Sequence, residues 1–106
     1  MYQHKELANG RWNTFTFFMQ MANIGSEVLR SLRWKEKDKI NSQLAAERAL
    51  ELLDLTMDDP KNHTSGRSKE LWRLREFMAD SLFFNNEYKS TLKSWENYFN
   101  ASCQII

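Results

Sequence analysis

The sequence predicts an all-α protein folded as a four-helix antiparallel bundle, and three observations carry this prediction. Apolar residues recur every three or four positions along most of the chain, which is the spacing of one helical face. With three Gly and one Pro in 106 residues, the chain has too few turn-forming residues for a turn-rich β-sandwich. A single Cys excludes a disulfide framework and any Cys-rich zinc module.

The length supports one hydrophobic core, so we divide the chain into a polar N-terminal arm, residues 1–11, and one helical domain, residues 12–106. Within this domain the apolar stripes predict four helices. The caps that we expect are Asn13 or Thr14 for the first helix, Ser68 for the third and Ser90 for the fourth. The helices are expected over about residues 14–36, 40–57, 68–84 and from Ser90 onward.

Two breaks in the pattern carry further predictions. Gly25 lies inside the first helix, where Gly costs about 1 kcal/mol relative to Ala, so we expect a close helix crossing there. Residues 58–67 collect Asp, Pro, Asn, Thr, Ser and Gly, and we expect a mobile loop.

The chain is rich in large apolar side chains, with four Trp and seven Phe. At helical spacing these aromatic residues are expected in a core rather than on a base-stacking surface. Their abundance also suggests self-association, and two helical hairpins completed by a second copy remain an alternative to a monomeric bundle. We therefore expect a homodimer or a complex with another protein.

The net charge of +1 hides an alternation along the chain, because an acidic stretch at 47–59 lies between basic stretches at 30–39 and 61–75. One interpretation is ion pairs between helices, each stabilising by roughly 0–1 kcal/mol. The other is a basic groove that binds the phosphates of a nucleic acid. Its candidate contacts are Arg30, Arg33, Lys35, Arg67, Lys69 and Arg73.

The sequence offers little support for a metal or a cofactor. Glu47, Glu51 and Asp54 share one helix face, as metal-binding carboxylates can. However, di-iron bundles use Glu-x-x-His motifs, and His4 and His63 both lie in expected loops. We therefore expect no metal and no cofactor.

Several charged residues adjoin the apolar stripes, where an unpaired charge would be expensive. We predict a polar network across helices formed by Glu27, Arg48, Arg75 and Asp80. Such a network usually fixes helix register, but it is also our first choice for a functional site. A hydrolase centred on Glu27, Arg75 and Asp80 is one hypothesis, although no known catalytic motif is present and we assign no catalytic residue.

No stretch has the roughly 20 apolar residues of a membrane-spanning helix, and no secretory signal is visible. We therefore expect a cytoplasmic protein without membrane contact.

Parts of the sequence resemble a family of small uncharacterised bacterial and archaeal helical proteins, over about residues 21–100. That resemblance implies a helical fold and brings no established activity. The residues that carry it are Asn23-Ile24-Gly25-Ser26-Glu27-Val28, Trp34-Lys35, the run from Glu47 to Thr56, Arg73-Leu74-Arg75-Glu76, Asp80 and Asn86-Glu87-Tyr88.

A second, weaker resemblance is to HEPN-type helical domains, whose active motif is an Arg followed four to six residues later by His. Here Arg75 is followed after four residues by Asp80, which cannot replace an imidazole near neutral pH without a large pKa shift. This resemblance implies a bundle linked to RNA or to a nucleotidyltransferase partner, without ribonuclease activity. Our leading functional prediction is a protein–protein interaction module, and the nucleic-acid-linked module is the alternative.

Overall fold

A computed structural model describes the backbone of residues 10–104 and the side chains of residues 10–101. Most of the expected N-terminal arm, residues 1–9, lies outside the described part, as does the side chain of Cys103. The described chain forms two short 3₁₀ helices and four α-helices. These are η1 Arg11–Thr14, α2 Phe17–Trp34, α3 Lys39–Asp58, η2 Pro60–Asn62, α4 Ser65–Phe83 and α5 Leu92–Gln104.

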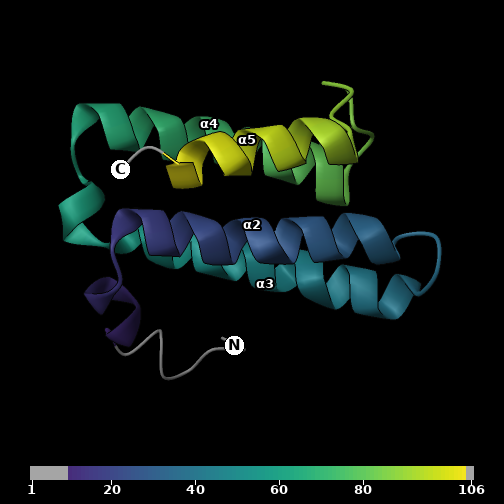
Figure 1. The fold of residues 1–106 in the computed structure, drawn as a ribbon, viewed down its shortest axis with the longest axis horizontal. Helices are drawn as coiled ribbons and strands as arrows, with labels where there is room; N and C mark the ends of the chain where they lie inside the picture. The colour runs from purple at the N-terminus through teal and green to yellow at the C-terminus, as the bar shows by residue number, and fades with distance from the viewer. Residues whose placement is uncertain (1–9, 105–106) are drawn as a thin grey trace.

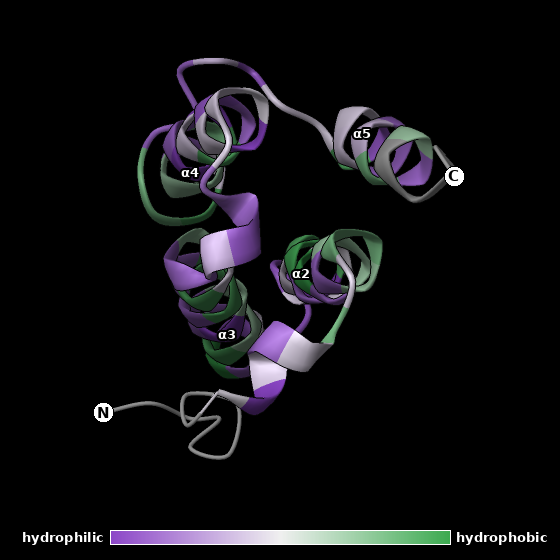
Figure 2. Ribbon diagram, turned by 90° about the vertical axis from the view of Figure 1, so that its left-hand side faces the viewer, coloured by the Kyte–Doolittle hydropathy of each residue, from purple (hydrophilic) through white to green (hydrophobic). Residues whose placement is uncertain are grey.

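The four α-helices form an antiparallel bundle in which each helix runs opposite to the one before it (Figure 1). Helix α2 packs against α3 and α5, and α3 also packs against α4. Seen nearly end-on, α4 lies beside α3 and α5 beside α2, while α4 and α5 stand apart (Figure 2). The predicted all-α four-helix architecture is therefore confirmed.

The apolar stripes meet in one core. On α2 the buried positions Met21, Ile24 and Val28 follow steps of three and four, as helical packing requires. The expected close crossing is at Gly25, where a Cβ atom would lie 2.6 Å from Cγ of Phe99 on α5. Glycine at this position therefore lets the ring of Phe99 rest directly on the backbone of α2.

The helices begin at different residues from those expected. Thr16, rather than Asn13 or Thr14, caps α2 and accepts a hydrogen bond from the backbone N–H of Met19. Thr64, rather than Ser68, caps α4, which therefore starts three residues earlier than predicted. The expectation from the sequence favoured Ser68 because Gly66 looked like part of a loop, but the helix includes this glycine.

The aromatic residues do not all enter the core. Trp12 and Trp95 are buried, with 1% and 4% of their surface exposed. Trp34 and Trp72 are 43% and 65% exposed, and Phe83 and Phe84 are 38% and 74% exposed. The expectation of an aromatic core is therefore wrong for these four residues.

Residues 58–67 are not a simple polar loop, because Asp59 and Asn62 are buried in it. The amide of Gln20, on α2, donates to Asp59 at 2.8 Å and accepts from Asn62 at 3.0 Å. Asn62 also donates to the carbonyl of Thr56, and Gln20 donates to the carbonyl of Trp12. We call these five buried residues the Gln20 cluster, and it fastens η1 and η2 to one end of the bundle.

Candidate functional site

The four residues of the predicted polar network lie in three separate places. Glu27 of α2 and Arg48 of α3 face one another, with Nη1 of Arg48 3.9 Å from Oε2 of Glu27. Arg30 pairs with the other carboxylate oxygen of Glu27 at 3.2 Å. The buried Oε2 atom of Glu27 has no hydrogen-bond partner within the described residues.

Arg75 and Asp80 have other partners. Nε of Arg75 lies 3.3 Å from Oδ1 of Asp54 on α3. Asp80 accepts hydrogen bonds from the backbone N–H groups of Glu87 and Tyr88, at 2.7 and 3.1 Å. Five residues turn an α-helix by roughly 140° beyond a full turn, so Arg75 and Asp80 leave α4 in different directions. The expected single network, and a hydrolase centre built on it, therefore do not form.

The charged stretches instead produce ion pairs between neighbouring helices. Arg75 joins α4 to α3, and Arg33 of α2 lies 3.2 Å from Glu96 of α5. Exposed pairs of this kind stabilise by roughly 0–1 kcal/mol.

The six candidate phosphate contacts do not line one groove. Helices α2 and α4 run in the same direction, so the end of α2 and the start of α4 lie at opposite ends of the bundle (Figure 1). Arg30 and Arg33 are paired with carboxylates, and the guanidinium of Arg67 rests over the ring of Phe17 at 4.6 Å. Lys35 is exposed at the end of α2, whereas Lys69 and Arg73 are exposed on α4. The expected basic groove therefore does not form, because α2 and α4 run in the same direction and their cations lie at different ends of the bundle.

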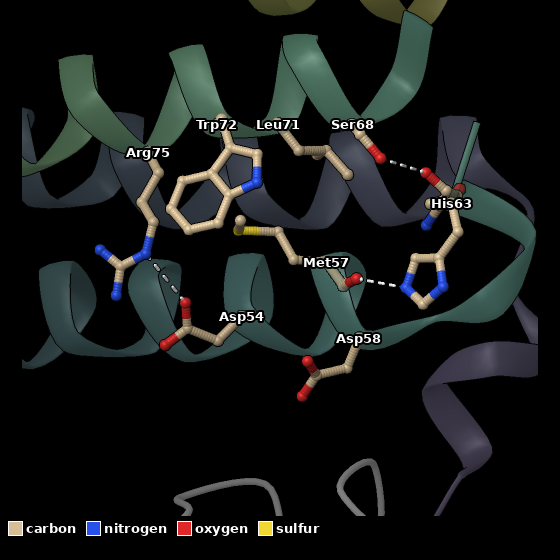
Figure 3. A pocket seen from close by; sticks show the side chains of 9 residues that line it. Asp54, Met57, Asp58, His63, Ser68, Leu71, Trp72 and Arg75 are labelled. Carbon is tan, nitrogen blue, oxygen red and sulfur yellow. Dashed lines mark hydrogen bonds and ion pairs between the residues drawn. The ribbon is translucent and has the colours of Figure 1, made fainter. Parts of the chain in front are cut away.

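A pocket of about 550 Å³ opens between α3, η2 and the outer side of α4. Figure 3 shows Asp54, Met57 and Asp58 entering it from α3, while Trp72 and Arg75 enter it from α4. The remaining lining residues are Asn62, His63, Ser68 and Leu71.

The charges of this pocket are unequal, because its lining holds two carboxylates, Asp54 and Asp58, and one guanidinium, that of Arg75. Partial burial raises the pKa of Asp54, and the nearby Asp58 raises it further, while Arg75 opposes the shift. The carboxylate of Asp58 is exposed at the rim. The pocket therefore has an excess of negative charge.

The polar side chains of the pocket do not form a catalytic pair. Nε2 of His63 lies 2.9 Å from the carbonyl oxygen of Met57, and the hydroxyl of Ser68 donates to the carbonyl of Asn62 at 3.4 Å (Figure 3). A nucleophile needs a base within hydrogen-bond reach, and here both candidates bind backbone carbonyls instead. The described residues also contain no cluster of three or more side chains suited to hold a metal ion.

Trp72 is the feature of this pocket that sequence reasoning missed. Its indole extends from α4 over the pocket and is 65% exposed (Figure 3). A signal was present in the sequence, because Trp72 falls outside the buried stripe of Leu71, Leu74 and Met78. A large aromatic residue outside its helix's apolar stripe is a candidate surface contact.

Comparisons of the chain with protein-family models, curated proteins and solved structures returned no match. The resemblances inferred from the sequence therefore stay predictions. Among the described residues, no helix combines the length and the apolar character needed to cross a lipid bilayer.

Proposed function

We propose that this protein is a protein–protein interaction module, and that the pocket beside Trp72 receives a positively charged segment of its partner. The observation that carries the proposal is the exposed indole of Trp72 beside a pocket with excess negative charge. Tryptophan is among the residues that contribute most to binding at protein interfaces.

The chemistry of the pocket favours a Lys or Arg side chain as the part of the partner that enters it. The face of an indole attracts a cation, by roughly 0.5–1 kcal/mol at an exposed site. Asp58, an exposed residue lining the same pocket, adds a carboxylate for a cationic partner. Glu47 extends the negative charge along the exposed face of α3. Together these groups favour a basic partner and disfavour an acidic one.

The proposal is tested by replacing His63, an exposed residue that lines the same pocket, with a photo-crosslinking phenylalanine analogue in cells, so that Trp72 is kept. The matched control carries the same analogue in place of Trp34, which is exposed at the end of α2. We expect a discrete adduct from position 63 that disappears when Asp58→Lys is added, because a lysine at position 58 repels a basic segment. An adduct that persists with Asp58→Lys, or that forms equally from position 34, would contradict the proposal.

A second copy of the chain is one form the partner could take, and it is tested by light scattering. If the wild-type protein is a dimer and Trp72→Ala makes it a monomer, the partner is a second copy that binds through this pocket. A wild-type monomer that still forms the adduct identifies a different protein. The six cations assigned to phosphate contacts do not favour a nucleic acid as a second candidate, because they are divided between the two ends of the bundle.

A further inference from the structure

A second concave site lies on the opposite side of α4, lined by residues of α4, of α5 and of the loop that joins them. The ribbons of α4 and α5 stand apart from each other (Figure 2). Two side-chain hydrogen bonds bridge this gap: the indole of Trp95 donates to the hydroxyl of Ser81 at 3.1 Å, and the hydroxyl of Tyr98 donates to Glu70. Between these bridges and the loop that joins the two helices lies a groove of about 520 Å³, which we call the α4–α5 groove.

The lining of the α4–α5 groove is mainly apolar and aromatic. Leu74 and Trp95 are buried, with 3% and 4% of their surface exposed. The rings of Phe77 and Tyr88 lie against each other, with their centroids 4.4 Å apart, and the ring of Tyr98 completes the aromatic lining. Sites for small molecules typically have this size and an apolar lining with few polar groups.

Two cations stand at the groove, Arg73 from α4 and Lys89 from the loop. The guanidinium of Arg73 lies 5.9 Å from the ring of Phe77. The carboxylate in the lining, Glu70, already accepts a hydrogen bond from the hydroxyl of Tyr98, and Glu76 at the edge accepts one from the hydroxyl of Tyr88. The lining holds two cations against one carboxylate, and Glu76 adds a second carboxylate at the edge, so an acid group is favoured only where it contacts Arg73 and Lys89 directly.

The loop that carries Tyr88 and Lys89 is held in place by hydrogen bonds. Asp80 accepts from the backbone of Tyr88, and the amide of Asn86 binds both the N–H and the carbonyl of Ser90. Lys89 itself has a positive φ of 55° and donates its backbone N–H to Asn86. The groove is thus formed before any ligand arrives, which reduces the loss of conformational entropy on binding.

We propose that the α4–α5 groove binds a small apolar anion, such as an aromatic or fatty acid, with its apolar body on Phe77 and Trp95 and its acid group on Arg73 and Lys89. This site does not include Trp72, so the inference is independent of the proposed protein partner.

The test uses anilinonaphthalene sulfonate, a fluorescent aromatic anion, as the probe. We expect saturable binding to the folded protein, weakened about tenfold or more in Arg73→Ala/Lys89→Ala, because both charge-assisted contacts are lost. The matched control is Lys37→Ala/Lys69→Ala, which removes the same charge from exposed positions outside the groove and should leave the affinity unchanged. Near-ultraviolet circular dichroism checks that each variant remains folded.

Three competitors distinguish the sources of the ligand chemistry. Dodecanoate should displace the probe better than dodecanol, because only dodecanoate carries an acid group. If the groove prefers aromatic acids, naphthoate should displace the probe better than dodecanoate. Backbone amide shifts in NMR spectra should change at Phe77, Tyr88 and Ser94 and remain unchanged at Trp72. Equal affinity in the two double variants, no saturable binding, or shifts scattered over the surface would each overturn the inference.

Discussion

The indole nitrogen of Trp12 donates a 2.9 Å hydrogen bond to the hydroxyl of Thr56, 44 residues further along the chain, and both residues are buried. The hydroxyl of Thr56 in turn donates to the carbonyl of Leu52 at 2.8 Å. Through this contact the 3₁₀ turn η1 is fixed to the last turns of α3, at the end of the bundle where the pocket beside Trp72 opens.

Replacing Thr56 with valine tests this relationship. The change keeps the shape of the side chain but leaves the buried N–H of Trp12 without its acceptor, so unfolding should need about 1–3 kcal/mol less free energy. Urea denaturation followed by circular dichroism measures the difference. Thr14→Val is the control, because Thr14 bonds the carbonyl of Arg11 at an exposed position and should change stability by less than about 0.5 kcal/mol. Equal effects of the two substitutions would contradict this account.

The sequence was a good guide to the helices because their signal is local. Met21, Ile24 and Val28 lie on one face of any helix, whatever it packs against. The Gln20 cluster has no such signal, since Gln and Asn are usually exposed and here are buried only because two distant short segments meet.

The candidate sites divide in the same way. The separation of Arg75 from Asp80 follows from helical geometry and was available in the sequence. The pairing of Arg75 with Asp54 depends on which helices become neighbours, which no local pattern specifies. The α4–α5 groove likewise depends on the space between two helices, so it emerges only from the packed structure.

Replacing Gly25 or Gly66 with alanine should change the stability of the protein in opposite directions. Gly25→Ala places a methyl group against the ring of Phe99, and such overpacking costs about 1–3 kcal/mol, more than the roughly 1 kcal/mol that alanine contributes through helix propensity. Gly66, in the first turn of α4, has open space around it, so Gly66→Ala should stabilise the protein by up to about 1 kcal/mol. Thermal unfolding of both variants gives the comparison.

A double-mutant cycle isolates the cause of the first effect. In a Phe99→Ala background the ring is absent, so Gly25→Ala should no longer destabilise the protein. A loss of stability that is the same with and without the ring would place the strain elsewhere on α2.

Asp59 predicts a pH dependence of stability. Burial alone would raise the pKa of this carboxyl, but hydrogen bonds from Lys61 and Gln20 outweigh it and hold the pKa below its ordinary value of 3.8. Because the folded pKa is the lower one, the stabilisation is fully present above the unfolded pKa and is lost as pH falls through the folded pKa.

Asp59→Asn keeps the size of the side chain but removes its titration. At neutral pH the variant should be less stable than the wild type by about 1–3 kcal/mol, because Lys61 and Gln20 lose their charged acceptor. Below about pH 4 this difference should shrink as the wild-type carboxyl becomes protonated. Denaturation curves between about pH 7 and about pH 2 measure it. A difference that stays constant over this range would show that the charge of Asp59 does not stabilise the fold.

Asp80 predicts how the α4–α5 groove depends on its loop. Its two oxygens accept from the backbone N–H groups of Glu87 and Tyr88, so Asp80→Ala should release both amides and lower the local stability by about 1 kcal/mol or more. Hydrogen exchange should accelerate at these two amides while the amides of α2 keep their protection. Because the same loop carries Lys89, the affinity for anilinonaphthalene sulfonate should fall as well.

Glu87→Ala is the control, since its side chain is exposed and its backbone N–H is retained. Unchanged exchange at residues 87 and 88 in Asp80→Ala would mean that the loop is ordered by other contacts, with Asn86 the first to examine.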